Sequence, residues 1–233
     1  MENIFKRHEK KYLISREQGE VFQKIISPHM EPDQFGEYLV QNIYYDNESW
    51  DVIRASIEKP VYKEKIRLRC YDIPEKESRV FLELKKKYLG VGYKFRIPFP
   101  FRDLLHHSIG DLVSAETSQI SKEIDYIMKR NSVSEKIFIS YTRAAFNGLE
   151  HKDLRITFDT NIRFRLKNLN FSDPVEGMSM IPYNKILMEI KTFDGMPFWM
   201  ARALCEQGIF PAPFSKYGKC YTDYILKEEQ LNA

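Results

Sequence analysis

Apolar and polar residues alternate along most of this chain, which is the two-residue period of a β-strand with one buried face. Short turns separate these stretches more often than helices do, and this favours an antiparallel sheet. The pattern predicts strands over 6–13, 39–46, 62–71, 79–88, 92–99, 136–144, 153–159, 161–166 and 185–192.

A period of three to four residues interrupts the strands at four places. Ser15 followed by Gln18 predicts a capping box and a helix through about Ile26, which Pro28 ends. Further helices are predicted over about 117–131, 196–207 and 217–230. No internal repeat, low-complexity segment or Gly/Ser linker divides the chain, so we expect a single α+β domain over residues 1–233.

The polar faces of the strands are rich in cations. In 62–71, Ile66 and Leu68 project from one face, and the opposite face is basic. A single strand of this kind is an ordinary solvated strand. The same division recurs on six other strands, however. The charged or polar positions are Arg7, Glu9, Lys11, Lys65, Arg67, Arg69, Glu83, Lys85, Lys87, Lys94, Arg96, Tyr141, Arg143, Arg155, Asp159, Arg163, Arg165, Glu189 and Lys191.

If helices cover the apolar faces, the charged faces meet on the other side of the sheet. A sheet of about eight strands can close into a barrel and turn those faces inward. Cations that are packed together and desolvated are costly unless an anion neutralises them. We therefore expect a closed antiparallel β-barrel, flanked by helices, whose basic tunnel binds a multiply charged anion. Phosphate is the natural candidate, because Arg offers paired donors and Lys a mobile charge.

Three glutamates share the basic faces: Glu9, Glu83 and Glu189. Each can neutralise neighbouring cations when the tunnel is empty. Each can also hold Mg²⁺ or Mn²⁺ against phosphate oxygens, since hard cations prefer oxygen ligands. The pattern alone leaves both interpretations open.

Composition changes this picture little. The 233 residues are 43% apolar and carry a net charge of only +3, so a basic site must come from local arrangement. Cys70, Cys205 and Cys220 lack the spacing of a zinc site or a disulfide framework. The N-terminus is charged, and no segment approaches the roughly 20 apolar residues of a membrane span. We expect a cytoplasmic protein without a membrane segment.

At this point the residues resemble a known family. The motifs, in chain order, are R-H-E-K-K-Y at 7–12, Y-Y-D-N at 44–47, K-I-R-L-R-C-Y at 65–71, F-L-E-L-K-K-K at 81–87, Y-T-R-A-A-F at 141–146, L-M-E-I-K at 187–191 and F-S-K-Y at 214–217. Over nearly its whole length the chain resembles the catalytic domain of the vacuolar transporter chaperone (VTC) polyphosphate polymerases, within the triphosphate tunnel metalloenzymes.

The resemblance implies a tunnel that holds a nucleoside triphosphate and a divalent metal. Catalytic roles would fall on Lys11, Arg67, Arg69, Arg143 and Lys216. Substrate binding would fall on Arg54, Lys65, Lys85, Lys87, Lys94, Arg96, Lys191 and Ser215. Glu189 would be the main metal ligand for Mn²⁺ or Mg²⁺, with Glu83 and Glu9 as further candidates.

The function expected from this resemblance is transfer of the terminal phosphoryl group of ATP to a growing inorganic polyphosphate chain. Arg7, Glu9 and Lys11 on the first strand differ from the E-x-E-x-K signature of related triphosphatases, which favours the polymerase. The alternatives are hydrolysis of tripolyphosphate, of an RNA 5′-end or of a nucleoside triphosphate, and a non-catalytic polyphosphate-binding module. Nucleic acid is not an expected partner, and the sequence does not indicate an oligomeric state.

Overall fold

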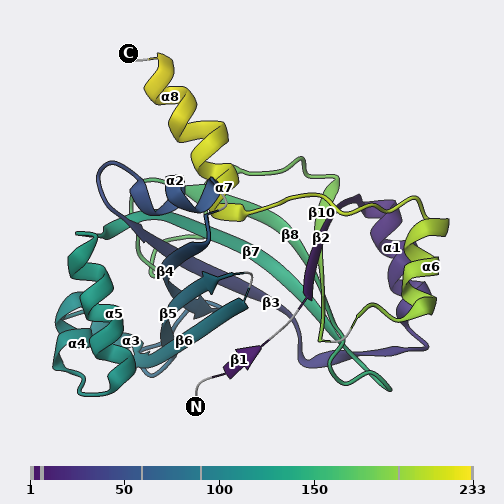
Figure 1. Ribbon diagram of the computed structural model, residues 1–233, viewed down its shortest axis with the longest axis horizontal. Coiled ribbons are helices and arrows are strands. Elements are labelled where there is room, and N and C mark those ends of the chain that lie inside the picture. The colour runs from purple at the N-terminus through teal and green to yellow at the C-terminus, as the bar shows by residue number, and fades with distance from the viewer. Residues whose placement is uncertain (1–2, 6–7, 59, 90, 194, 232–233) are drawn as a thin grey trace.

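A computed structural model of the chain describes residues 3–5, 8–58, 60–89, 91–193 and 195–231. Helices flank one antiparallel sheet (Figure 1). The strands are β1 (Asn3–Phe5), β2 (His8–Ser15), β3 (Met30–Asp46), β4 (Tyr62–Tyr71), β5 (Arg79–Tyr88), β6 (Val91–Pro100), β7 (Ser134–Gly148), β8 (Arg155–Arg165), β9 (Met178–Ser179) and β10 (Lys185–Thr192). The helices are α1 (Arg16–Ile26), α2 (Asp51–Ile57), α3 (Phe101–Leu104), α4 (Ile109–Ala115), α5 (Gln119–Arg130), α6 (Phe198–Glu206), α7 (Lys216–Cys220), the π-helical η1 (Tyr221–Ile225) and α8 (Leu226–Leu231).

The ten strands run in the order β1-β6-β5-β4-β3-β7-β8-β10-β2, with β9 paired to β8. β1 and β2 follow one another in the chain, yet they lie at opposite ends of this order. Within the described residues, no hydrogen-bonded ladder joins these two ends. The α+β class is therefore confirmed, whereas the closed barrel is not, and the sheet has ten strands rather than about eight.

Three predicted strands differ most from the structure in their limits. The stretches 153–159 and 161–166 form the single strand β8, because the chain passes through a positive φ of 50° at Asn161 and stays paired to β7 across a bulge. The strand predicted over 39–46 begins already at Met30. A bulge between Pro32 and Glu37 keeps this segment paired to β7.

All four predicted helical segments are present in the structure. At α1, Gln18 N donates to Ser15 Oγ at 3.1 Å and Ser15 N donates to Gln18 Oε1 at 3.0 Å, so the capping box is present. α5, α6 and the C-terminal helical segment also lie where expected. The short helices α2, α3 and α4 were not predicted.

Arg7 lies outside the described residues. No helix in the described part of the chain is long and apolar enough to cross a membrane.

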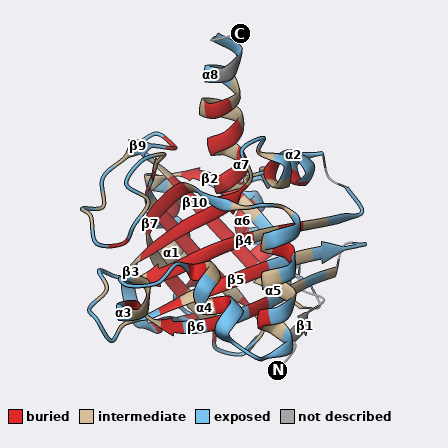
Figure 2. Cartoon of the chain, turned by 90° about the vertical axis from the view of Figure 1, so that its left-hand side faces the viewer, coloured by how far each residue is buried: buried red, intermediate tan, exposed pale blue. Residues whose placement is uncertain are grey.

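Helices cover the outer, apolar face of the sheet in separate groups, and Figure 2 shows the strands beneath them as mostly buried. α3, α4 and α5 pack on β4, β5 and β6 through residues such as Leu82, Ile124 and Ile127. α1 and α6 pack on β2, β8 and β10, where Phe22 and Ile26 of α1 are fully buried. Each such side chain contributes about 1.5–3 kcal/mol of burial free energy. The opposite face of the sheet is thereby left for the charged residues.

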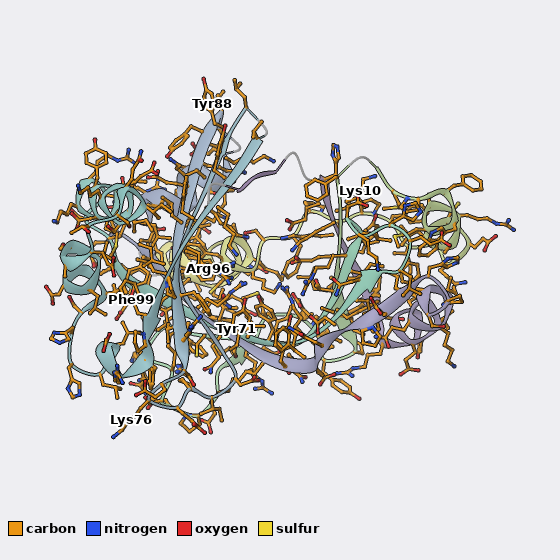
Figure 3. The ribbon with its side chains drawn as sticks, turned by 90° about the horizontal axis from the view of Figure 1, so that it is seen from below. Lys10, Tyr71, Lys76, Tyr88, Arg96 and Phe99 are labelled. Atoms are coloured by element: carbon orange, nitrogen blue, oxygen red, sulfur yellow. The ribbon has the colours of Figure 1, made fainter. Side chains whose placement is uncertain are left out.

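The two faces of the sheet can be seen on the single strand β6. Phe99 of β6 lies on the side of α3 to α5, and Arg96 of the same strand points into the space between the two halves of the sheet (Figure 3). This split follows the two-residue period that the sequence predicts.

Candidate functional site

A cavity of about 520 Å³ lies on the charged face of the sheet. Strands from both ends of the sheet line it, since β2 supplies Glu9 and Lys11 and β6 supplies Gly92 and Lys94. The two ends of the sheet therefore face each other across the cavity, although no ladder between described residues joins them. The segment at the start of α7 completes the wall with Ser215 and Lys216.

Most of the residues singled out from the sequence meet in this cavity. Its lining includes Glu9, Lys11, Lys65, Arg67, Arg69, Lys85, Lys87, Lys94, Arg143, Glu189, Lys191, Ser215 and Lys216. Of the residues to which the resemblance gives a role, three do not line it. Arg54 is exposed on α2, Glu83 pairs with the lining residues Arg67 and Lys94, and Arg96 pairs with Glu83. Arg163 and Arg165 bind backbone carbonyls of the segment 168–177 instead.

Several lining residues were missed. Lys63 precedes Lys65 by two positions, so the same strand period could have identified it. Tyr44 and Tyr217 lie in the motifs Y-Y-D-N and F-S-K-Y but carry no charge, and nothing in the local pattern marks them as cavity residues. Tyr44 Oη accepts a hydrogen bond from Arg67 at 3.2 Å, which explains its place in the site.

Glu83 forms the first of two ionic centres. It is fully buried, and its Oε2 lies 2.7 Å from Arg67 and 3.9 Å from Arg69. Its Oε1 lies 2.7 Å from Lys94 and also pairs with Arg96. Burial alone would raise the pKa of Glu83, but four cations outweigh it and hold the pKa far below its ordinary value. Glu83 is therefore an internal counter-ion that fixes the guanidinium groups around it.

Asp159 and Glu189 form the second centre. Arg143 makes a bidentate pair with Asp159, at 2.6 and 2.7 Å. Lys216 Nζ lies 2.5 Å from Asp159 Oδ2 and 3.3 Å from Glu189 Oε1, so it bridges the two carboxylates. Lys11 in turn lies 3.6 Å from Glu189 and 3.3 Å from Glu9. Despite burial, these cations keep the pKa of Glu189 well below its usual range, and the carboxylate is ionised at neutral pH.

Arg69 links the two centres through neutral partners. Its Nε donates to Asn42 Oδ1 at 2.9 Å, and its Nη2 donates to Tyr141 Oη at 3.3 Å. The Tyr141 ring also lies under Lys216, whose Nζ is 4.3 Å from the ring centroid. Although burial raises the pKa of Tyr141, the surrounding cations bring it down to about 8.

Not every cation in the cavity has an acidic partner. Among the described residues, no ion pair joins Lys65 or Lys85 to a carboxylate, and Lys65 Nζ donates only to Ser215 Oγ at 3.3 Å. Burial and the neighbouring cations lower the pKa of Lys65 to about 8. Burial lowers the pKa of Lys94 to about 8, against the opposing effect of Glu83. For Lys85, the charge of Arg67 and burial together hold the pKa well below its ordinary value.

The lowered pKa values of these lysines predict that protons are taken up when a polyanion binds. A bound polyanion favours the charged form of each lysine and so raises its pKa, which means that binding takes up protons near pH 8. Affinity is therefore expected to fall as the pH rises above about 8. Titration calorimetry with tripolyphosphate at pH 8, in two buffers of different ionisation heat, measures the uptake. Lys65→Arg, which stays protonated, should take up about 0.5 proton fewer than the unsubstituted chain with the same ligand. Equal uptake in both would contradict the assignment.

A divalent metal would need ligands from the substrate as well as from the protein. No group of three or more His, Cys, Asp or Glu side chains in the described residues is arranged to hold a metal ion. Glu9 and Glu189 nevertheless face the same cavity and are joined through Lys11. Mg²⁺ is commonly bound by one or two carboxylates plus phosphate oxygens, and this donor set fits that mode of binding.

Comparisons with known proteins concern the family and the fold of the chain. The model of the VTC domain family matches residues 6–224. None of the curated proteins compared with the chain matches it. A Hippeastrum protein, described as a candidate adenylyl cyclase with a dominant triphosphatase activity, has a TM-score of 0.52 and 17% identity over 93% of each chain. A protein of Pyrococcus horikoshii OT3 has a TM-score of 0.50 and 15% identity, over 96% of this chain and 99% of that one.

A third solved structure, described as a candidate adenylate cyclase of Vibrio parahaemolyticus, has a TM-score of 0.50 and 11% identity, covering 94% of this chain and all of the other. At these identities the structural likeness establishes the fold alone. The family match spans nearly the whole sequence, from the first cavity-lining strand to the C-terminal helical segment. The chain therefore belongs to the VTC domain family.

Proposed function

We propose that this protein is a polyphosphate polymerase, which transfers the terminal phosphoryl group of ATP to a growing inorganic polyphosphate chain. The observation that carries the proposal is the lining of the cavity, where lysine and arginine side chains project from β2, β4, β5, β6, β7, β10 and α7. Both ATP and polyphosphate present a row of anionic oxygens, and such a lining can neutralise either of them along its length.

Phosphoryl transfer to a phosphate acceptor requires the protein mainly to position the reactants and to neutralise their charge. The acceptor is a terminal phosphate, which is already ionised near neutral pH, so a general base is not required. A bond forms between an acceptor oxygen and the γ-phosphorus, and the bond from that phosphorus to the β–γ bridging oxygen breaks. ADP leaves. Positioning and stabilisation of the equatorial oxygens supply most of the lowering of the barrier.

The two ionic centres suggest a division of roles. Arg67, Arg69 and Arg143 would neutralise the transferring group, because their guanidinium groups are held rigidly by Glu83, Asn42 and Asp159. Lys11 and Lys216 would bind the donor phosphates near Glu189. Lys65, Lys85, Lys87 and Lys191 would guide the polyanion. Arg96 would act only through Glu83, and the exposed Arg54 is not part of this proposal.

Glu189 and Glu9 would hold Mn²⁺ or Mg²⁺. Such an ion would supply additional charge neutralisation at the phosphate oxygens. Glu83 was also a candidate ligand, but both of its oxygens are already paired with cations, so we assign it the role of counter-ion.

Two rival functions use the same cavity. Hydrolysis differs only in its acceptor, a water molecule, and the dominant activity of the Hippeastrum protein is of this kind. A non-catalytic polyphosphate-binding module would use the cations alone, and its binding would depend strongly on salt and not on divalent metal. The buried carboxylates Asp159 and Glu189 count against it, since they lower the positive charge that simple binding would use.

A direct assay separates these functions. Purified protein is incubated with ATP, Mn²⁺ and a short polyphosphate primer, and the products are resolved by gel electrophoresis. The expected result is long polymer with stoichiometric ADP. Release of free phosphate without polymer would support the triphosphatase, and no turnover with metal-independent binding would support the module. Glu189→Ala is expected to abolish polymer formation, and full activity in that variant would remove the metal assignment.

A further inference from the structure

Asp46 lies outside the cavity lining, yet it connects three elements that meet beside the cavity. This carboxylate ends β3 and is fully buried. Its Oδ1 accepts from Asn47 N at 2.9 Å and from Val52 N at 3.0 Å. Its Oδ2 accepts from Ile53 N at 2.9 Å and from the phenol of Tyr217 at 2.6 Å. One side chain therefore joins the end of β3, the start of α2 and the start of α7.

Tyr217 follows Lys216 directly, so whatever fixes Tyr217 also fixes the backbone that carries Lys216. The ring of Tyr217 stacks on Tyr44 with centroids 4.8 Å apart, and Tyr44 in turn contacts Arg67. Burial and the charge of Asp46 raise the pKa of the Tyr217 phenol, which therefore remains a hydrogen-bond donor. At Gly218, an added Cβ would lie 3.2 Å from Ser215 Cβ and 3.8 Å from Ile57 Cγ1, so α7 lies close against α2.

Lys216 needs such support, because its ammonium is held between two carboxylates and an aromatic ring in a geometry with little freedom. A shift of the α7 backbone would change its distances to Asp159 and Glu189 together. The ends of long side chains move readily, and displacements near 1 Å at a reacting group reduce activity strongly.

We propose that Asp46, through its hydrogen bond to Tyr217, is a positioning residue that holds Lys216 at the phosphate-binding cavity. This inference rests on the proposed function only in taking the cavity as a polyphosphate site. Of the hydrogen bonds named above, only the one to Tyr217 joins Asp46 to a cavity residue, so the positioning effect acts through α7. Separately, the charge of Asp46 opposes the lowering of the pKa of Lys65, and Tyr217→Phe leaves that charge in place.

The test is a double-mutant cycle read by calorimetric binding of tripolyphosphate. Tyr217→Phe removes only the phenol oxygen. It is expected to weaken binding about tenfold, which corresponds to about 1.4 kcal/mol. In a Lys216→Gln background the same change should weaken binding less than about twofold, since the residue it positions has lost its charge. Tyr224→Phe is the matched control. Tyr224 lies in η1, on the same helical segment as Tyr217, and its phenol donates to the carbonyl of Ser179 in β9, so affinity should not change.

Each outcome decides something. An equal loss from Tyr217→Phe in both backgrounds, or none in either, overturns the proposal. If Tyr217→Phe is not folded at 25 °C, Asp46→Asn is put through the same cycle, and failure of both to fold would make the link purely structural and also overturn it. Absence of tripolyphosphate binding by the unsubstituted protein would instead refute the proposed function, and the polymer assay would then show no polymer.

Discussion

Replacing Glu83 by Gln is expected to lower the free energy of unfolding by about 3 kcal/mol, because breaking a buried ion pair leaves uncompensated charges in the interior. Arg67 and Arg69, with side-chain exposures of 10% and 8%, would lose their common counter-ion. Lys94 and Arg96 are about one-third exposed, so water moderates their share of the loss. Urea unfolding monitored by circular dichroism measures the difference.

Tripolyphosphate gives this result a specific signature. In Glu83→Gln the cations lack their internal anion, so the ligand should stabilise the variant more than the unsubstituted protein. At a fixed concentration 100 times its Kd for the unsubstituted protein, the ligand adds about 2.7 kcal/mol to that form, and a larger gain in the variant reports tighter binding. Glu206→Gln, which removes an exposed partner of Arg202, is the control and should stay within about 0.5 kcal/mol. Equal stability of Glu83→Gln and the unsubstituted chain would show that Glu83 is not the counter-ion.

The second large effect is expected at Arg69. Arg69→Gln should lower the rate of polymer formation by about 100-fold, the usual size of the loss when one preorganised donor to the developing charge is removed. The fold should be little changed, because Arg69 lies 3.9 Å from Glu83 while Arg67 pairs with that carboxylate at 2.7 Å. This makes Arg69 a cleaner test than Arg67. Initial rates at saturating ATP measure the effect.

Arg102→Gln provides the comparison for Arg69. Arg102 pairs with Glu77 on the surface, its side chain is 54% exposed, and it does not line the cavity. Its loss should leave the rate unchanged. A rate for Arg69→Gln within about threefold of the unsubstituted protein would place the reacting phosphates elsewhere.

The alternating pattern of the strands was enough to predict which side chains share the charged face of the sheet. Lys65, Arg67 and Arg69 share a face because strand geometry leaves no other choice, and that face borders the cavity. Closure of the sheet could not be predicted in the same way. It depends on where the end strands β1 and β2 lie relative to each other, and a two-residue period contains no such information.

The roles of individual residues were harder to predict than their placement. Glu83 and Glu189 look alike in the sequence, since each follows a leucine-rich strand pattern among lysines. In the structure, Glu83 is fully buried and paired with four cations, whereas Glu189 lines the cavity. Tyr217 and Asp46 are joined by a contact between distant parts of the chain, and local patterns cannot reveal such a pair.

The pairing of β2 with β10 has a consequence for synthesis on the ribosome. Among described strands, β2 pairs only with β10, so Glu9 and Lys11 meet Glu189 and Lys191 late in translation. Until then neither edge of β2 is paired in a ladder between described strands, and other chains can join it. Closing so long a loop is also slow, because its entropy is lost before the contacts form. A nascent chain would thus emerge with the β2 and β10 sides of the cavity still unassembled.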